Sequence, residues 1–100
     1  METKIKQTEQ GLFWYQNGEW HREDGPAVEW FSGTKEWWQN GKMHREDGPA
    51  LETYSGMKLW CLDGEFFSEN EFNQIISKKK LNEKLQLNLS KKINNKRIKI

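Results

Sequence analysis

One seven-residue segment, His-Arg-Glu-Asp-Gly-Pro-Ala, occurs twice with identical residues, at positions 21–27 and 44–50. The two copies begin 23 positions apart (44 − 21 = 23). A catalytic centre needs one copy of its residues, whereas a stacked structural unit needs the same residues in every copy. The duplication therefore predicts a repeated architecture before it predicts any activity.

The same offset relates a second set of residues. Three segments of the form Trp-x-x-(Asn/Asp)-Gly begin at Trp14, Trp37 and Trp60. Their last two residues are Asn17-Gly18, Asn40-Gly41 and Asp63-Gly64. Asn-Gly and Asp-Gly favour the type I′ turn of a two-residue β-hairpin, because both central residues of that turn need a positive φ. Each unit is thus predicted to have a long aromatic arm, a tight turn and a short arm.

Between these hairpins, the Gly-Pro pairs at 25–26 and 48–49 interrupt the sheet, since proline has no N–H to donate. A further strand is expected after each pair, over residues 27–31 and 50–54. Roughly seven or eight short strands result, at the spacing typical of all-β proteins. The predicted fold is mainly β with a C-terminal α-helix: an antiparallel meander of short hairpin repeats with a 23-residue period, closed by a capped helix.

The third unit ends the array. Ser68 and Glu71 form a capping box, in which Ser68 is the N-cap and Glu71 the third helical residue, so a helix is expected to begin near Glu69. Leucines at four-residue spacing beyond Lys80 leave open whether one helix or two follow. The predicted organisation is an N-terminal arm (1–10), a repeat sheet (11–67), a helical segment (68–93) and a basic, frayed tail (94–100).

The composition describes a chain with a thin, aromatic core. Only 34% of the residues are hydrophobic, 31% are charged, and six are tryptophan. No apolar run is long enough for a membrane helix, and the first residues are polar, so we expect a cytoplasmic protein that does not bind a membrane. Cys61 is the single cysteine, which excludes an intrachain disulfide and a zinc site with several Cys ligands; a packed thiol is favoured.

The net charge of +1 conceals two opposite regions. Residues 1–76 carry 7 basic and 14 acidic side chains (7 − 14 = −7), and residues 77–100 carry 9 basic and 1 acidic side chain (9 − 1 = +8). The basic region could pair with an acidic sheet, its own or a neighbour's, or it could bind an anionic partner. Nucleic acid is possible through this tail but is not favoured.

Aromatic residues are expected on both faces of the sheet. Successive residues of a strand point to opposite faces, so Trp37 and Trp38 must place one ring on each. One short helix can cover only one face. The other face is then exposed, binds a ligand or is buried against a second protomer, and we expect a homo-oligomer.

The His-Arg-Glu-Asp segments combine a base, a cation and two carboxylates, a set that is compatible with several kinds of site. A metal site would require His21 and Asp24 to converge with His44 and Asp47. An enzyme would require a nucleophile with an oriented base, and the sequence contains no such pattern. We predict no catalytic residue, no metal site and no cofactor. A structural role is favoured, in which His packs on aromatics, Arg pairs with carboxylates and Asp caps the loop.

Ligand recognition is the other interpretation, because arginine can hold a phosphate while an aromatic ring stacks on a base. The predicted ligand-binding or partner-binding residues are Trp20, His21, Arg22, Trp30, Met43, His44, Arg45 and Tyr54. At the position of Trp20 the later units carry Met43 and Phe66. This position is apolar without requiring tryptophan, so it is expected to line a variable contact surface.

Residues 37–50, with the sequence Trp-Trp-Gln-Asn-Gly-Lys-Met-His-Arg-Glu-Asp-Gly-Pro-Ala, resemble short repeats found in many phage and giant-virus proteins, which are similar in style to MORN-type repeat variants. Residues 64–72 resemble the way such arrays close. The resemblance covers about residues 11–76. It implies a hairpin-repeat fold and a viral or mobile-element origin, with no established activity and no catalytic residues to transfer.

The sequence therefore favours a non-enzymatic binding protein, and we expect a phage or viral inhibitor that binds a host defence protein in the host cytoplasm. The alternative is a sponge that sequesters a nucleotide immune signal at an aromatic and arginine pocket between protomers. An enzyme acting through the His-Arg-Glu-Asp segments ranks last.

Overall fold

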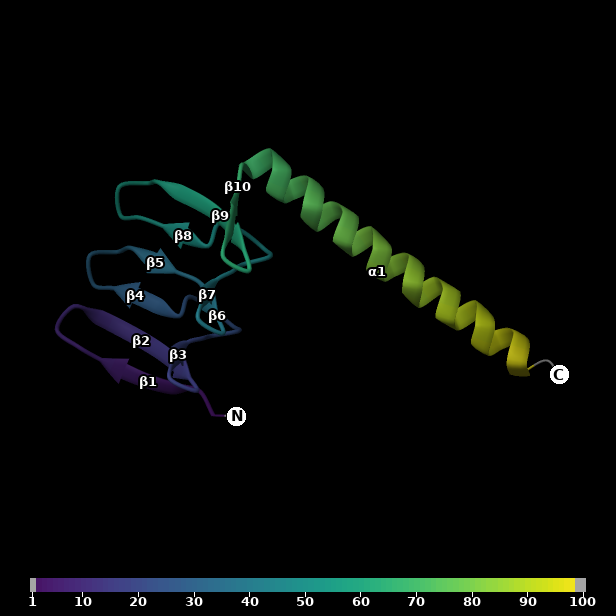
Figure 1. The fold of residues 1–100 in the computed structure, drawn as a ribbon, viewed down its shortest axis with the longest axis horizontal. Helices are drawn as coiled ribbons and strands as arrows, with labels where there is room; N and C mark the ends of the chain where they lie inside the picture. Colours follow the sequence, from purple (N-terminus) through teal and green to yellow (C-terminus); the bar gives the residue numbers. More distant parts are fainter. Residues whose placement is uncertain (1, 99–100) are drawn as a thin grey trace. The chain divides into compact units, whose positions relative to one another are not determined.

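The computed structural model describes the backbone of residues 2–98 and the side chains of residues 2–91. The chain divides into two compact units, Met1–Glu69 and Asn70–Ile100. The first is an antiparallel sheet of short strands and the second belongs to one helix (Figure 1). The predicted class, mainly β followed by a C-terminal helix, is confirmed.

All strand pairs are antiparallel. The main sheet has the order β1-β2-β4-β5-β8-β9-β10, with β3 also paired to β2, while β6 and β7 form a separate two-stranded sheet. The strands are β1 (Lys4–Gln7), β2 (Gly11–Gln16), β3 (Glu19–Trp20), β4 (Val28–Trp30), β5 (Lys35–Glu36), β6 (Trp38–Gln39), β7 (Lys42–Met43), β8 (Leu51–Glu52), β9 (Lys58–Leu62) and β10 (Glu65–Phe67).

Tight turns join β2 to β3, β6 to β7 and β9 to β10. Their φ values are 56° and 76° at Asn17 and Gly18, 52° and 74° at Asn40 and Gly41, and 48° and 83° at Asp63 and Gly64. Two successive positive φ values are the signature of a type I′ turn. The three turns predicted from Asn-Gly and Asp-Gly are therefore confirmed.

Wider turns join β1 to β2, β4 to β5 and β8 to β9, at the other end of the hairpins (Figure 1). Backbone bonds link one wide turn to the next: the Phe31 N–H donates to the Gln10 carbonyl at 2.8 Å. The Tyr54 N–H donates to Thr34 Oγ1 at 3.2 Å. The hairpins are thus tied together at this end as well.

The first strand was not predicted. Residues 1–10 were expected to form an arm, but β1 pairs with β2 from Lys4 opposite Tyr15 to Gln7 opposite Leu12. All four residues of β1 are exposed. A strand with no buried side chain has no apolar alternation, so the sequence pattern could not reveal it.

The aromatic arm before the Asn40-Gly41 turn is not one strand: it is divided into β5 and β6 at Trp37. Trp37 is where pairing changes from one neighbour to another: its N–H donates to the Ala50 carbonyl at 2.8 Å, and its carbonyl accepts from the His44 N–H at 3.0 Å. Trp14 makes the corresponding bonds, yet β2 is continuous, because β1 pairs with it along its length.

The second unit belongs to one helix, α1 (Glu69–Ile98), of 30 residues. It begins directly after Ser68, as the capping box predicts. Residues 94–98, expected as part of a frayed tail, are helical, and residues 99–100 lie outside the described part of the chain. No helix in the described residues has an apolar stretch long enough to cross a lipid bilayer.

The buried core is small. In the sheet unit its apolar members are Phe13, Ala27, Val28, Ala50 and Cys61, and in the helix they are Phe72 and Ile76. The two alanines end the two His-Arg-Glu-Asp-Gly-Pro-Ala segments and are fully buried. Most of the aromatic side chains are only half-buried, which leaves them partly available for contacts.

Candidate functional site

Residues 21–27 and 44–50, hereafter the connectors, are loops that leave and rejoin the sheet at the same tryptophan. The His21 N–H donates to the Trp14 carbonyl at 3.0 Å, and the Trp14 N–H donates to the Ala27 carbonyl at 2.8 Å. Residues 22–26 therefore bulge out between two bonds to one residue. Trp37 anchors the second connector in the same way, through His44 and Ala50.

Each connector histidine bonds to the tight turn of the following hairpin. His21 Nδ1 accepts from the Asn40 N–H at 3.0 Å, and His44 Nδ1 accepts from the Asp63 N–H at 3.0 Å. An accepting nitrogen carries no proton, so the neutral ring has its hydrogen on Nε2. His21 is only 5% exposed. These histidines are joints between hairpins.

Each connector arginine lies on the ring of its anchoring tryptophan. The guanidinium carbon is 4.1 Å from the Trp14 ring centroid for Arg22 and 3.9 Å from the Trp37 centroid for Arg45. On its other side Arg22 meets Gly25, where an added Cβ would be 2.9 Å from the guanidinium carbon. The guanidinium is held between an indole and a glycine, a stacking that lysine cannot reproduce.

The donors of these arginines are also used within the connector. Arg22 Nε donates to Asp24 at 3.0 Å, and its Nη1 donates to the Pro26 carbonyl at 3.2 Å. Arg45 makes the corresponding bonds and adds one from Nη1 to Glu52 at 3.2 Å. The Arg22 hydrogen bond and charge hold the pKa of Asp24 below its usual range. The pairing of each arginine with a carboxylate is the contact that a structural role of the segment would require.

A hollow of about 410 Å³ lies between the two connectors. Its charged lining comprises Arg22, Glu23, Asp24, Arg45, Glu46 and Asp47. Carboxylates outnumber guanidinium groups four to two, which opposes an anionic ligand such as a nucleotide. No three His, Cys, Asp or Glu side chains converge on a metal-sized site within the described residues.

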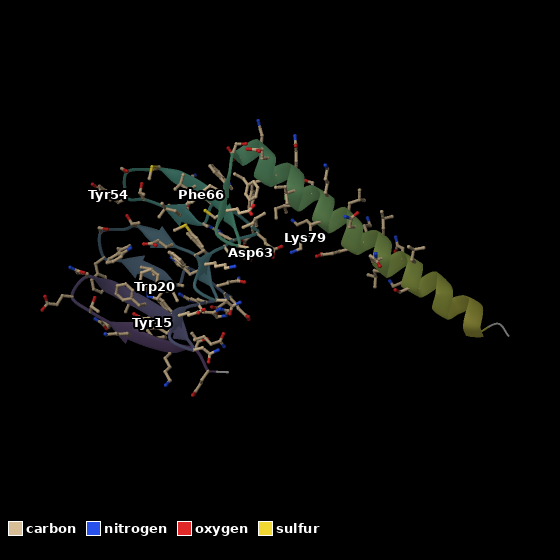
Figure 2. The ribbon with its side chains drawn as sticks, viewed as in Figure 1. Tyr15, Trp20, Tyr54, Asp63, Phe66 and Lys79 are labelled. Atoms are coloured by element: carbon tan, nitrogen blue, oxygen red, sulfur yellow. The ribbon has the colours of Figure 1, made fainter. Side chains whose placement is uncertain are left out.

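A different surface is formed by one face of the sheet. The register places Tyr15 with Trp20, Glu36 with Leu51, and Cys61 with Phe66 on the same side. We call this side the aromatic face. Besides the exposed Lys4 and Lys6 of β1, its half-buried or exposed members are Tyr15, Trp20, Trp30, Glu36, Trp38, Met43, Leu51, Leu59 and Phe66. Tyr15 and Trp20 lie by β2 and β3, and Phe66 lies on β10 at the other edge (Figure 2).

The rings of the aromatic face contact one another above Phe13. The centroids of Phe13 and Trp20 are 6.1 Å apart in a stacked arrangement, and those of Phe13 and Trp30 are 5.2 Å apart edge to face. Trp20 and Trp38 are 5.1 Å apart edge to face. Trp38 thus points to this face while Trp37 lies under Arg45, as side-chain alternation predicts.

Glu36 bridges two of these rings through hydrogen bonds. Its Oε2 accepts from Trp30 Nε1 at 2.6 Å and its Oε1 accepts from Trp38 Nε1 at 3.0 Å. The sequence interpretation overlooked this residue. Its position in the strand could have revealed it: Glu36 is two residues before Trp38, so both side chains point to the same, apolar side of the strand.

The opposite face of the sheet is charged. Glu29 lies opposite Lys35, Lys35 opposite Glu52, and Glu52 opposite Lys58. Neighbouring opposite charges of this kind suit a surface that stays in water. On this face the central strands are therefore charged, whereas its Trp14 and Trp37 rings lie under the connector arginines.

Cys61 points to the aromatic face, opposite Phe66 in the register. It is fully buried, with Sγ 3.7 Å from the Met43 sulfur. Burial raises the pKa of its thiol. Both observations fit a packed side chain and disfavour a reactive thiolate.

The eight predicted binding residues occupy three places. Trp20, Trp30 and Met43 lie on the aromatic face. His21, Arg22, His44 and Arg45 lie in the connectors. Tyr54 lies in a wide turn and is 77% exposed.

The chain matches no family model, no curated protein and no solved structure.

Proposed function

We propose that this chain is a non-enzymatic binding protein that engages a partner protein through the aromatic face of its sheet. The observation that carries the proposal is a contrast across the central strands: one face has alternating Glu and Lys, and the other has the contacting rings of Trp20 and Trp38 with Trp30 beside them. On β10 the same face continues with Phe66, which is 65% exposed. Contiguous apolar surface of this kind marks interaction sites on proteins.

The composition of this face supports the proposal. Tryptophan, tyrosine, phenylalanine and methionine are the residue types enriched where proteins meet. A shallow hollow of about 510 Å³ runs along the face beside Tyr15, Trp20 and Trp38 and the tight turns next to them. It offers room for apolar side chains of a partner.

The connectors give the face a rigid frame. Their histidines and arginines bond within the sheet unit, so we propose that they hold successive hairpins in a 23-residue repeat and take no part in chemistry. Trp20, Met43 and Phe66 occupy the corresponding place in the three hairpins. On this proposal, side chains at that place adapt the face to its partner.

The resemblance to repeats of phage and giant-virus proteins adds a proposal about the partner. We propose a host protein of the cytoplasm, in particular one that acts in defence. The connectors favour this over a nucleotide ligand, because Arg22 and Arg45 already donate to carboxylates and carbonyls of their own loops.

A photo-crosslinking residue tests the proposal in cells that express the chain. Benzoylphenylalanine placed at Phe66, on the aromatic face, is expected to give a covalent adduct with the partner. The same residue at Lys58, which is exposed on the charged face, is the matched control. Equal adducts from both positions, or none from Phe66, would contradict the proposal. An adduct of twice the 12.0 kDa chain mass would identify the partner as a second copy.

A further inference from the structure

Glu36 carries a charge in the middle of an apolar row. The register places it between Val28 of β4 and Leu51 of β8, both apolar, on the aromatic face. The other acidic residues of the central strands, Glu29 and Glu52, point to the opposite face and lie opposite lysines. Glu36 is the exception to this segregation.

Among residues 2–91, the groups that donate hydrogen bonds to the Glu36 carboxylate are neutral. Each oxygen accepts one indole N–H, at 2.6 Å from Trp30 and 3.0 Å from Trp38. No Lys, Arg or His side chain among residues 2–91 forms an ion pair with it. An ionised carboxylate has about four acceptor positions, so it can accept further donors beside the two indoles.

This arrangement has a consequence for any partner that covers the face. Burying a carboxylate without a compensating cation is strongly unfavourable, and two neutral donors do not remove its charge. A wholly apolar partner surface would be penalised here. A partner that brings a cation would form a short, charge-assisted hydrogen bond in surroundings from which the rings exclude water.

We propose that the aromatic face receives a lysine or arginine side chain of a foreign protein at Glu36, between Trp30 and Trp38. The inference rests on the proposed function, since it concerns the same face, and it adds the chemistry that the partner must present. That chemistry is one cationic group surrounded by apolar side chains, which meet Trp20, Leu51 and the other apolar members of the face.

The experiment uses the full chain, labelled with ¹⁵N, and n-butylammonium chloride as a probe for a lysine side chain. The indole N–H resonances of Trp30 and Trp38 are followed during titration at constant ionic strength, with 1-butanol as the uncharged probe. Saturable shifts are expected with the ammonium and not with the alcohol. Glu36→Gln is expected to weaken ammonium binding about tenfold, as loss of a charge-assisted bond does.

Glu65→Gln is the matched control, because Glu65 is exposed, lies on the opposite face and makes the same change of charge. It should leave the titration unchanged. Equal responses to butylammonium and butanol, or equal effects of Glu36→Gln and Glu65→Gln, would overturn the inference. The comparison of the two probes on the unsubstituted chain needs no variant, so it decides even where Glu36→Gln does not fold.

Two further outcomes separate the inference from the proposed function. Crosslinking from Phe66 that persists in Glu36→Gln, with no selectivity for butylammonium, would leave the function standing and remove the inference. Self-association seen by light scattering and abolished by Glu36→Gln would assign the cation to a second copy of this chain, and would overturn the proposal of a foreign partner.

Discussion

The connectors and the aromatic face of the sheet differ in how strictly their residues are repeated from one hairpin to the next. The two connectors have identical residues, and the polar groups of each histidine and arginine bond within the sheet unit. The aromatic face carries Trp20, Met43 and Phe66 at corresponding places and leaves them partly or largely exposed. In this fold, the residues that recur between hairpins form bonds that join them, and on the function we propose the residues that differ are the ones that adapt to a partner.

The physical reason lies in the kinds of force involved. The bonds between hairpins are directional, so a histidine nitrogen or a guanidinium must recur at the same place to meet the next turn or loop. Apolar contact is not directional and scales with buried area. A ring can therefore be replaced by methionine without altering the spacing of the strands.

The largest expected effect on stability distinguishes Phe13, which is buried beneath the aromatic face, from Phe66, which lies at the exposed rim of that face. Phe13 is buried under Trp20 and Trp30, so Phe13→Ala should lower the free energy of unfolding by about 3 kcal/mol through lost burial and a cavity. Phe66→Ala should change it by less than about 0.5 kcal/mol, because that ring is already in water. Chemical denaturation of both variants measures this.

The same pair of variants tests the function. With the photo-crosslinking residue moved to Tyr15 on the same face, Phe66→Ala should reduce the partner adduct although the fold is intact. A large loss of stability in Phe66→Ala, or an undiminished adduct, would show that the rim does not serve the role proposed for it.

A smaller effect is expected in the first connector. His21→Ala removes the acceptor of the Asn40 N–H and empties a buried site, which should cost about 2 kcal/mol. His21→Asn is the control, because its amide oxygen can take the place of Nδ1 and should restore about half of the loss. His44→Ala should cost less than His21→Ala, since the side chains are 12% and 6% exposed respectively.

Asparagine that restores nothing would mean that the imidazole stabilises by packing alone. The joint between hairpins would then depend on its backbone bonds, such as the one from the Gly41 N–H to the Trp20 carbonyl at 3.1 Å.

Gly48→Ala probes the stacking of Arg45 between Trp37 and the connector backbone. A Cβ at residue 48 would be 2.9 Å from the guanidinium carbon, and three hydrogen bonds, to Asp47, the Pro49 carbonyl and Glu52, restrain that group from moving away. The expected cost is about 1 kcal/mol. In an Arg45→Ala background the same substitution should cost almost nothing, and a double-mutant cycle measures the difference. If Gly48→Ala lowers the free energy of unfolding equally in both backgrounds, its effect does not come from contact with the Arg45 guanidinium.

Local patterns in the sequence were sufficient for part of this structure. Each tight turn depends on two adjacent residues, and the helix start depends on four, so Asn17-Gly18 and Ser68 could be interpreted directly. The duplication of the connectors favours a structural role for them. Such features depend on residues close together in the chain or on identity between copies.

The rest depends on residues that are distant in sequence and unlike one another. β1 is polar and exposed, and it is a strand only because β2 offers it a free edge. Glu36 gains its place from Trp30, six residues earlier, and from Trp38. The sequence suggested a single binding site from residue types, whereas the pairing register separates those residues into the connectors, the aromatic face and a wide turn.

The smallest expected effect concerns Asp24 and its dependence on pH. The hydrogen bond from Arg22 and its charge lower the pKa of Asp24 in the folded chain. A carboxyl with a lowered folded pKa stabilises the fold above its unfolded pKa, and this contribution is lost as the pH falls through the folded value. Asp24→Asn should therefore lower Tm slightly at pH 7, and the difference from the unsubstituted chain should shrink as the pH falls below about 4.

The effect is small because Asp24 is fully exposed and salt screens it. Thermal unfolding of both chains from pH 7 to pH 3, with Glu65→Gln as an exposed control, provides the measurement. If the Tm difference between the two chains instead grows on acidification, the ionised Asp24 carboxylate destabilises the connector. Arg22 would then be held by Trp14 and the Pro26 carbonyl without help from the ion pair with Asp24.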